Sequence, residues 1–405
     1  MRKLLFMLLS LGVTSEGFSA GFYLKEQSIV AQGQAFAGVA AQSGLASSTY
    51  FNPAGLGGME HDTLEGGVHL ILPDQRVRDS GSVTAAPLGN TNKSEQVPLS
   101  ETAVPNLYYA TPIDSETVVG VGISAPFGTD NRYDANFFGR FEHISGSLKA
   151  VDYTVALGHQ LTDRIRLGGA LYLQQLDVEQ VKATAATQTA TLEGDAEDMG
   201  FSLGAQYQTG TTTFGLSYRS GTEQDISGTN LISGTGTIPT GTYLAKTTMK
   251  LPAVTSVGIE HGINERTILY LGATRYGWSV YDAITVETAG IGASTTQNRY
   301  SDTTNFSIGV GHQYRADLQL RAGLMIDPTP TNNRDRSFST PDSDRAWITL
   351  GASKTVNDTT VVDIAFSHIR VDDAAINKVS GSGYAVSADI AANHNIISVG
   401  FRKTF

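Results

Sequence analysis

The sequence predicts an all-β fold, a transmembrane antiparallel β-barrel of about 14 strands whose lumen is filled by an N-terminal segment. First, apolar residues alternate with small or polar ones along most of the chain, as in Val151, Tyr153, Val155 and Leu157; this is the period of a strand with two unlike faces. Second, no run of about 20 apolar residues follows residue 20, which argues against a helical membrane bundle. Third, charged residues make up only 17%, against about 25% in soluble domains.

Composition narrows the function classes further. The 405 residues include 44 glycines, 16 tyrosines and 16 phenylalanines, and hydrophobic residues reach only 40%. So many aromatics argue against long disordered segments. The chain has no cysteine, which excludes disulfides and thiolate metal sites. Its net charge of −11 makes nucleic acid an unexpected partner, because nucleic-acid binding normally needs a basic surface.

Residues 1–20 read as a signal peptide. Arg2 and Lys3 form the positive region, residues 4–13 the apolar stretch, and Phe18-Ser19-Ala20 a small-residue end suited to cleavage. The apolar stretch is too short to span a bilayer. We therefore expect an exported protein.

Two architectures fit the alternation, a soluble sandwich with its apolar faces inside and an outer-membrane barrel with its apolar face outside. The non-apolar face consists mainly of Gly, Ala, Ser and Thr, as expected of a lumen. Aromatic residues such as Trp278 and Trp347 fall near strand ends, as in interfacial girdles. The chain ends with Ile397, Val399, Phe401, Lys403 and Phe405 on alternate positions. This pattern resembles the C-terminal strand of bacterial outer-membrane proteins, with Lys403 as the one departure, which so near the end could snorkel to the interface. These features favour the barrel.

The even number of strands suits a single-chain barrel. The predicted strands span 62–73, 105–112, 117–126, 148–161, 164–181, 197–209, 211–222, 243–262, 266–288, 296–314, 317–327, 345–356, 359–371 and 393–405. Tight turns alternate with long polar loops at 74–104, 127–147, 182–196, 223–242, 328–344 and 372–392. The short turns should face the periplasm and the long loops the exterior.

Residues 21–61 precede the first strand and do not alternate. The segment is rich in small residues, too short for an independent domain and too apolar for a tail. A plug inside the barrel, which would occupy residues 62–405, is the economical interpretation.

Several motifs carry a family resemblance. Residues 20–28 and Asn52-Pro53-Ala54 resemble the N-terminal hatch of the FadL/TodX family of outer-membrane transporters for long-chain fatty acids and other hydrophobic compounds. Ala125-Pro126-Phe127-Gly128, Phe138-Gly139-Arg140-Phe141, Leu320-Arg321-Ala322-Gly323 and Asp327-Pro328-Thr329-Pro330 are similar to later motifs of that family, in the same order. The resemblance implies ligand-gated passive transport through a plugged barrel with a lateral exit.

The resemblance also assigns roles to residues. The hatch would include Gly21, Phe22, Leu24, Glu26, Asn52, Pro53 and Ala54, although Asn-Pro also initiates ordinary turns. Ala125, Pro126, Phe127 and Gly128 would form a kink that opens the barrel wall, although they could simply end a strand. A proline cannot donate to the sheet, and a neighbouring glycine permits a bend.

Ligand contacts are predicted in two places. Phe137, Phe138, Arg140 and Phe141 lie in a long external loop, where they would form an initial groove for an amphipathic ligand or else pack on one another. Inside the barrel a carboxylate ligand would need a base. In fatty-acid members of the family, basic residues reach the lumen from the strands that correspond to 164–181 and 296–314. Here residues 171–180 of the first strand carry no base, which leaves room for an uncharged or aromatic substrate. Arg299 of the second is the predicted basic contact, with Gln174 and Gln180 as polar contacts.

The expected partners are a hydrophobic small molecule, outer-membrane lipid and lipopolysaccharide, and the barrel-assembly machinery during biogenesis; the protein would act as a monomer without cofactor or metal. A nonspecific porin or a surface adhesin on the same barrel is the alternative. A barrel enzyme is a weaker one, based on the acidic pairs Asp342/Asp344 and Asp372/Asp373 near His368, because acidic loop clusters are usually solvated. We therefore expect no enzymatic activity.

Overall fold

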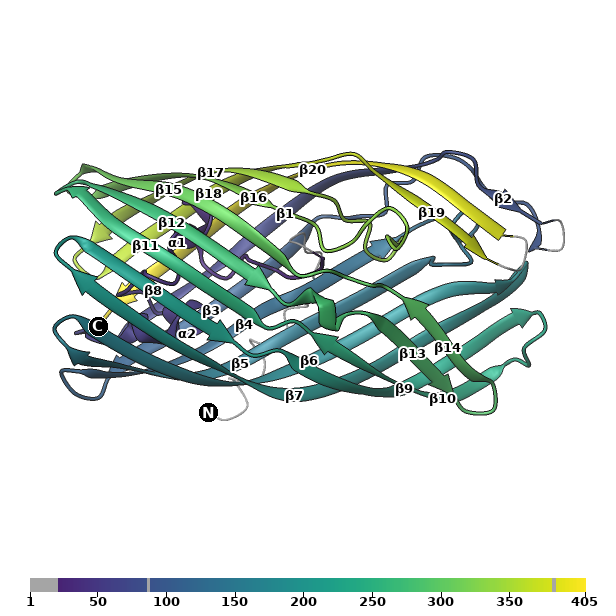
Figure 1. The fold of residues 1–405 in the computed structure, drawn as a ribbon, viewed down its shortest axis with the longest axis horizontal. Helices are drawn as coiled ribbons and strands as arrows, with labels where there is room; N and C mark the ends of the chain where they lie inside the picture. The colour runs from purple at the N-terminus through teal and green to yellow at the C-terminus, as the bar shows by residue number, and fades with distance from the viewer. Residues whose placement is uncertain (1–20, 86–87, 381–383) are drawn as a thin grey trace.

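In the computed structural model, the described residues (21–85, 88–380 and 384–405) form a closed antiparallel barrel of 14 strands. The barrel closes because the last strand pairs with the first, with Phe401 opposite Gly66. Figure 1 shows the short hairpin turns at one end, together with the C-terminus, and the longer strands and loops at the other. The predicted signal peptide, residues 1–20, lies outside the described residues.

Most barrel strands are single elements. These are β1 (Thr63–Asp79), β3 (Thr102–Pro112), β4 (Thr117–Arg132), β5 (Ser145–Thr162), β6 (Ile165–Ala185), β7 (Thr187–Thr209), β16 (Leu318–Asp327), β17 (Arg345–Asn357) and β20 (Tyr384–Thr404). The others are interrupted once: β8 (Thr212–Arg219) with β9 (Thr222–Thr235), β10 (Gly241–Leu251) with β11 (Val254–Asn264), β12 (Thr267–Tyr276) with β13 (Ala283–Thr288), β14 (Gly292–Gln297) with β15 (Thr303–Arg315), and β18 (Thr360–Val371) with β19 (Ala374–Ser380). A short 3-10 helix, η3 (Trp278–Val280), separates β12 from β13, and β2 (Val83–Thr84) pairs with β20.

The predicted barrel and its strand order are confirmed, but three predicted loops are wrong. Residues 182–196, 223–242 and 372–392 are largely strand, because β6, β7, β9, β19 and β20 extend into them. Ala183 of β6 still pairs with Thr189 of β7, close to the hairpin turn. Outside the hydrocarbon layer an outward residue need not be apolar, so the alternation on which the prediction relied fades while the strands continue.

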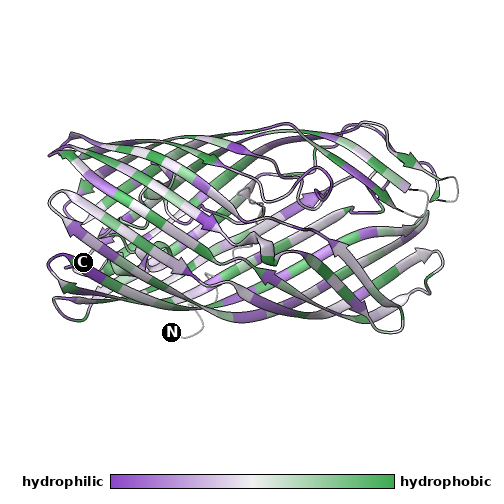
Figure 2. Cartoon of the chain, in the orientation of Figure 1, coloured by the Kyte–Doolittle hydropathy of each residue, from purple (hydrophilic) through white to green (hydrophobic). Residues whose placement is uncertain are grey.

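The outer wall carries the apolar side chains. Val155, Leu171, Ile326 and Val399 are each more than half exposed, and their sequence neighbours face the lumen. Figure 2 shows hydrophobic residues distributed around the middle of the barrel. Such an outward-facing band is what a lipid-facing wall requires.

Residues 21–59 fill the lumen and form the hatch. Their regular structure consists only of α1 (Ile29–Gln32), α2 (Ser48–Phe51) and η1 (Pro53–Leu56). Among the described residues, no helix is long and apolar enough to cross a membrane. The wall holds the hatch by hydrogen bonds to its backbone: Glu65 accepts from the Ser47 N–H at 2.9 Å, and Gln206 Nε2 donates to the carbonyls of Ala40 and Gln42.

Glycines on the inner wall let the hatch backbone approach the barrel backbone. We call this set the glycine girdle: Gly158, Gly168, Gly204, Gly215, Gly258, Gly272, Gly309, Gly323 and Gly351. Several are direct cross-strand partners, such as Gly168 with Gly204 and Gly215 with Gly258. A Cβ added at Gly168 would lie 2.3 Å from the Ala54 nitrogen. Nine of the 44 glycines of the chain therefore make room for the hatch.

Candidate functional site

The barrel wall is interrupted where β4 turns away from β3. The β3–β4 ladder covers only Leu107–Pro112 opposite Val118–Ile123. Beyond it, the β4–β5 register shifts between Ser124 and Phe127. In the described ladder, β3 continues to Ala103 and Thr102 with β1 as its partner and none on the β4 side. Pro126 lacks an N–H and cannot donate to a neighbouring strand, so regular pairing of β4 is interrupted at this residue.

The first residues of the hatch, 21–27, replace β3 at this point; we call them the strap. The Leu24 N–H donates to the Pro126 carbonyl at 2.7 Å, and the Gly128 N–H donates to the Phe22 carbonyl at 3.0 Å. The Gln27 side chain donates to the Ala125 carbonyl at 2.8 Å and accepts from the Ala125 N–H at 3.1 Å. The strap thus satisfies the backbone groups that the kink exposes.

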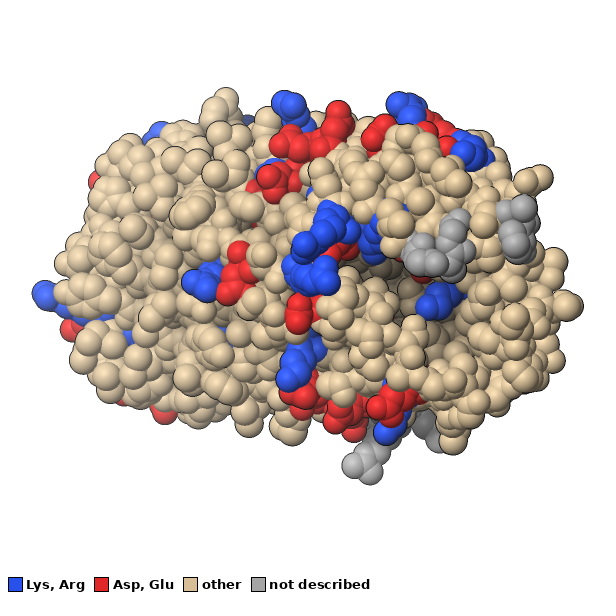
Figure 3. Space-filling model, turned by 45° about the vertical axis from the view of Figure 1, so that its right-hand side comes forward, with Lys and Arg blue, Asp and Glu red and all other residues tan. Residues whose placement is uncertain are grey.

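A cavity of about 360 Å³ lies inside the end of the barrel that carries the long strands and loops, next to the strap. This size is within the range of small-molecule sites. Figure 3 looks toward that end of the barrel, where the surface is hollowed and charged side chains gather around the opening. The apolar part of the lining includes Phe22, Leu148, Val178, Ile226, Met249, Ile284 and Val286.

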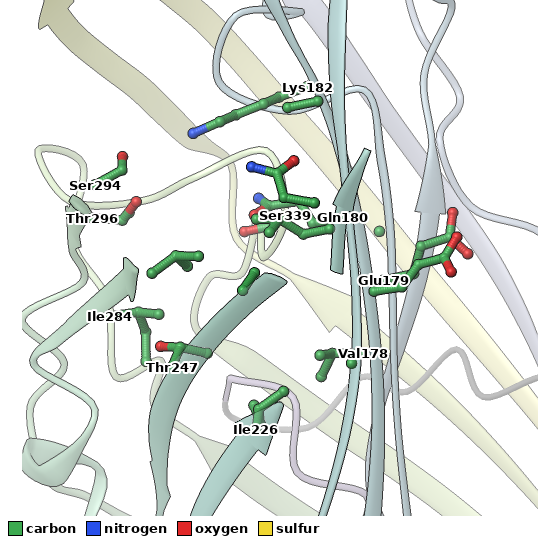
Figure 4. A pocket seen from close by; sticks show the side chains of 18 of the residues that line it. Val178, Glu179, Gln180, Lys182, Ile226, Thr247, Ile284, Ser294, Thr296 and Ser339 are labelled. Atoms are coloured by element: carbon green, nitrogen blue, oxygen red, sulfur yellow. The ribbon is translucent and has the colours of Figure 1, made fainter. Parts of the chain in front are cut away.

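Lys182 is the cationic side chain that points into this cavity. Figure 4 shows it pointing toward Ser294 and Thr296, whereas Glu179 points away from the cavity. Lys246, which also borders the cavity, is largely exposed and pairs with Glu287 at 3.1 Å. Within the described part of the chain, the Lys182 ammonium has no hydrogen-bond or ion-pair partner. Glu142, which pairs with Lys378 at 3.2 Å, acts on Lys182 without forming an ion pair with it. One end of an apolar cavity therefore carries a positive charge that is not directly paired.

Aromatic side chains separate the cavity from the hatch. The Phe22 ring lies 4.9 Å from Trp278, 5.2 Å from Tyr281 and 6.0 Å from Phe127, measured between ring centroids. Phe22 belongs to the strap and Phe127 to the kink. A molecule in the cavity would therefore touch the strap beside the interruption of the wall.

Two buried ionic networks surround the strap. In the first, Lys25 Nζ lies 2.8 Å from Asp327, which Arg345 approaches at 3.7 Å, and Arg345 also pairs with Asp342. In the second, Arg219 pairs with Asp152.

Arg219 also binds the hatch through aromatic rings. Its guanidinium lies 3.5 Å from the ring centre of Tyr172 and 5.0 Å from that of Tyr50. The Tyr50 hydroxyl lies 2.7 Å from that of Tyr23. Both networks therefore link hatch residues to strand or loop residues.

The predicted loop phenylalanines pack on one another. Phe137 and Phe138 are fully buried, and both contact Phe338. Phe141 contacts Tyr384, and Arg140 donates to Asn136 at 2.9 Å. None of these four residues lines the described cavity. Between the two interpretations of this loop, the geometry favours packing.

His143 lies in the same loop and does border the cavity. Its Nε2 is hydrogen-bonded to Asn131. Burial lowers the pKa of His143 to about 3, because the interior disfavours the charged imidazolium. The imidazole is therefore neutral at physiological pH.

The predicted polar and basic contacts lie in three different places in the structure. Gln180 lines the cavity. Gln174 lies in the Arg219 network, where it donates to Asp152 at 2.8 Å and accepts from Thr222 at 2.7 Å. Arg299 pairs with Asp335 of the 328–344 loop at 2.8 Å and is not part of the cavity lining.

The predicted hatch residues lie inside the barrel. Asn52 caps η1 by accepting from the Ala54 N–H at 3.1 Å, and its amide donates to the Leu216 carbonyl at 3.3 Å. Asn52-Pro53-Ala54 is thus both a turn and a contact with the wall. The Glu26 carboxylate is buried without a hydrogen-bond partner among the described residues.

Sequence reasoning missed most of the cavity. Lys182, Ile226 and Met249 were not predicted as ligand contacts, and Lys182 and Ile226 fell in segments predicted as loops. The alternation of Val178, Gln180 and Lys182 was a usable signal, since these positions share one face of a strand. No group of three or more histidine, aspartate or glutamate side chains among the described residues is arranged to hold a metal ion.

Comparison with known proteins agrees with this architecture. Residues 10–405 match the family described as outer membrane protein transport protein (OMPP1/FadL/TodX). The chain is 24% identical over 416 residues to the long-chain fatty acid transport protein of Escherichia coli K12, covering 90% of this chain and 91% of that protein. It is also 24% identical over 431 residues to outer membrane protein P1 of Haemophilus influenzae, covering 93% and 92%.

Solved structures share the fold. A Pseudomonas aeruginosa FadL homologue superimposes with a TM-score of 0.88 at 18% identity, covering 95% of this chain and 100% of that one. The Pseudomonas putida toluene transporter TodX gives a TM-score of 0.69 at 18% identity, covering 96% and 99%. The family match spans nearly the whole chain, and the barrel, hatch and interrupted wall are in place. The chain belongs to the FadL/TodX family of outer-membrane transport proteins.

Proposed function

We propose that this protein carries elongated hydrophobic molecules with one anionic end across the outer membrane by passive, ligand-gated diffusion. The observation that carries the proposal is the cavity, which is apolar near the strap and has the Lys182 ammonium, which makes no direct ion pair, at its other end. An apolar chain gains about 0.8 kcal/mol for each CH₂ group that leaves water. A carboxylate end would gain a charge-assisted hydrogen bond from Lys182.

The route follows from what borders the cavity. A bound molecule touches Phe22, and the strap that carries Phe22 is hydrogen-bonded to Pro126 and Gly128 of the kink. Displacing the strap would expose the gap between β3 and β4. The molecule would then leave sideways into lipid, and its apolar part would not return to water.

The remaining partners belong to the same proposal. The apolar outer wall would contact outer-membrane lipid. On the extracellular part of the outer face, Asp177 lies directly opposite Asp195, and Glu179 opposite Glu193. These carboxylates would face the lipopolysaccharide head groups. We further propose that the protein acts as a monomer and reaches the membrane through the barrel-assembly machinery.

Two lysines provide a matched test. Lys182→Met removes the inward ammonium, whereas Lys246→Met removes one that is largely exposed and paired with Glu287. We expect Lys182→Met to weaken binding of a long-chain fatty acid to the purified protein about 10- to 100-fold, because a hydrogen bond to a charged group contributes about 1.5–3 kcal/mol. Binding of the alcohol of equal chain length should change little, and Lys246→Met should resemble the wild type for both ligands.

Equal loss in both lysine variants, or an equal loss for acid and alcohol, would contradict the proposed anionic end. A planar-bilayer measurement separates transport from a general porin. The intact protein should show almost no ion conductance, and deletion of residues 21–45 should raise it. A large conductance of the intact protein would argue for a porin.

A further inference from the structure

The strap begins inside the protein, at an acidic side chain. Gly21 is buried, and its N–H donates to Asp342 Oδ2 at 2.9 Å. The same oxygen accepts from the Thr329 hydroxyl at 2.6 Å, and the other oxygen of Asp342 takes the Arg345 guanidinium. The nitrogen of Gly21 is thus the end of the strap that meets the Lys25–Asp327–Arg345–Asp342 network.

The geometry at Gly21 admits only glycine. Its φ is +72°, in the left-handed region that side chains disfavour. A Cβ there would lie 2.9 Å from the Trp278 ring. The residue that follows the predicted cleavage point after Ala20 is therefore the one that fits beside Asp342.

An unused acceptor belongs to a residue that borders the same small cavity as Gly21. Gly21 and Gln75 border a small cavity of about 10 Å³, which has room for about one water molecule. The Gln75 side chain is 2% exposed and donates to the Pro341 carbonyl at 3.0 Å. Its oxygen Oε1 is buried and accepts no hydrogen bond from any described residue. The peptide N–H of Gly21 can donate only one hydrogen bond, and Asp342 already accepts it.

We propose that signal-peptide cleavage between Ala20 and Gly21 places the new α-ammonium group of Gly21 on the Asp342 carboxylate, so that maturation itself completes the attachment of the strap. Hydrolysis by a signal peptidase consumes one water molecule. The C–N bond of the peptide breaks, Ala20 keeps a carboxylate, and the Gly21 nitrogen carries the protons of an ammonium at neutral pH. An ammonium offers three donors, which suffice for Asp342 and, directly or through one water molecule, for Gln75 Oε1.

The change strengthens the attachment. An N⁺–H donor to a carboxylate makes a shorter and stronger hydrogen bond than a neutral amide. Buried charge pairs are costly to break by removing one partner, because the other charge is left uncompensated. The strap is then fixed by Gly21 on one side of Phe22 and by the kink on the other.

The attachment also has a consequence for gating, which rests on the proposed function. Phe22 lines the ligand cavity and directly follows Gly21 in the chain. A ligand that displaces Phe22 must pull on the Gly21–Asp342 pair. Ligand binding should therefore expose the α-amine.

The test measures access to that amine. The mature protein is purified from outer membranes, its N-terminus is determined by sequencing and intact mass, and the folded protein is treated with 2-pyridinecarboxaldehyde, which reacts selectively with N-terminal α-amines. We expect the sequence to begin at Gly21 and the folded protein to react at least 10-fold more slowly than the same protein unfolded in urea. A different first residue, or equal rates in both states, would overturn the proposal.

Substitutions at two neighbouring carboxylates distinguish protection of the α-amine by the ion pair from protection by burial alone. Asp342→Asn should react at least 10-fold faster than the wild type, whereas Asp344→Asn, in which the exposed neighbour is changed, should match it. If the α-amine is as well protected in Asp342→Asn as in the wild type, the proposed ion pair is overturned. Should Asp342→Asn fail to fold, Gln75→Leu replaces it and must also react faster than the wild type.

Ligand addition tests the gating consequence separately. We expect a saturating long-chain fatty acid to accelerate labelling of the folded wild type. Unchanged labelling in a protein that binds the ligand would overturn the gating consequence. Unchanged labelling in a protein that binds no hydrophobic ligand would instead overturn the proposed function, and the measured protection would still support the ion pair.

Discussion

Two adjacent glycines that face opposite sides of one strand can test whether the glycine girdle sets the position of the hatch. Gly168 belongs to the glycine girdle, and a Cβ there would lie 2.3 Å from both the nitrogen of Ala54 and the carbonyl carbon of Pro53. A Cβ at Gly169 would have only Ser202 and Leu203 nearby, at 3.8 and 3.9 Å. Gly168→Ala and Gly169→Ala therefore add the same atom to the same strand, and only one of them disturbs the hatch.

The expected magnitude follows from the overlap. Both atoms near Gly168 belong to backbone, which cannot rotate away, so η1 must move by roughly 1 Å to restore ordinary contact. Overpacking of this kind costs about 1–3 kcal/mol. If the cost falls on the seated hatch, the population of the unseated form rises about 5- to 150-fold. Gly169→Ala should change stability by less than about 0.5 kcal/mol.

Single-channel recording in planar bilayers measures the unseated population as time spent in a conducting state. Hydrogen exchange at residues 48–57 reports the same event in the purified protein. We expect both to increase in Gly168→Ala and to remain at wild-type values in Gly169→Ala. Identical behaviour of the two variants would refute the claim that the girdle sets the position of the hatch, since the effect of an added Cβ on the unfolded chain is common to both.

Three further predictions concern the kink, the buried arginine and the loop histidine. Pro126→Val combined with Gly128→Thr should straighten β4 and reduce uptake of hydrophobic substrate while leaving binding in the cavity intact; unchanged uptake would argue against a lateral exit. Asp152→Asn leaves Arg219 buried without its anion and should cost about 3–5 kcal/mol in urea unfolding, whereas Glu223→Gln, which breaks an exposed pair with Lys250, should cost less than about 1 kcal/mol. His143 has a pKa of about 3 when folded and about 6.5 when unfolded, so the opened loop binds a proton more readily and the stability of the loop falls as the pH falls below about 6.5. Between pH 7.5 and 5.5 the loop should lose about 1.4 kcal/mol of stability. Hydrogen exchange at residues 133–144, corrected for intrinsic rates, should become correspondingly faster in the wild type and not in His143→Gln.

The membrane part of the fold could be predicted because lipid imposes a readable pattern. Wherever the wall meets hydrocarbon, outward positions such as Leu171 and Val399 must be apolar while their neighbours face the lumen. Above the membrane that requirement ends. Residues 187–196 of β7 carry threonine, alanine and carboxylates on their alternating positions, so their strand character is set by pairing with β6 and β9, which the sequence does not display.

The site was less predictable because its residues meet only through long-range closure of the barrel. A buried aromatic in a loop suits either a ligand groove or a packed cluster. For Phe137 and Phe138 the deciding partner is Phe338, some 200 residues away in the chain. Arg299 was a reasonable basic contact, but Asp335 neutralises it. Lys182 differs in making no direct ion pair, because Glu142, which acts on it, is paired with Lys378.

The position of the kink relative to the membrane explains how an amphipathic molecule could leave through it. On β5, next to the kink, the outward residues change from the exposed Val155 and Tyr153 to Lys149, and Lys149 is the partner of Gly128. The gap in the wall therefore opens where hydrocarbon gives way to head groups. A molecule leaving there could insert its apolar chain into lipid while its charged end stays among the head groups, so no charge would need to cross the hydrocarbon layer, which is costly. On this proposed route the strap is the part of the hatch that is hydrogen-bonded to the kink, whereas the Asn52-Pro53-Ala54 turn and the rest of the hatch seated in the glycine girdle would remain in place and keep the lumen closed to ions.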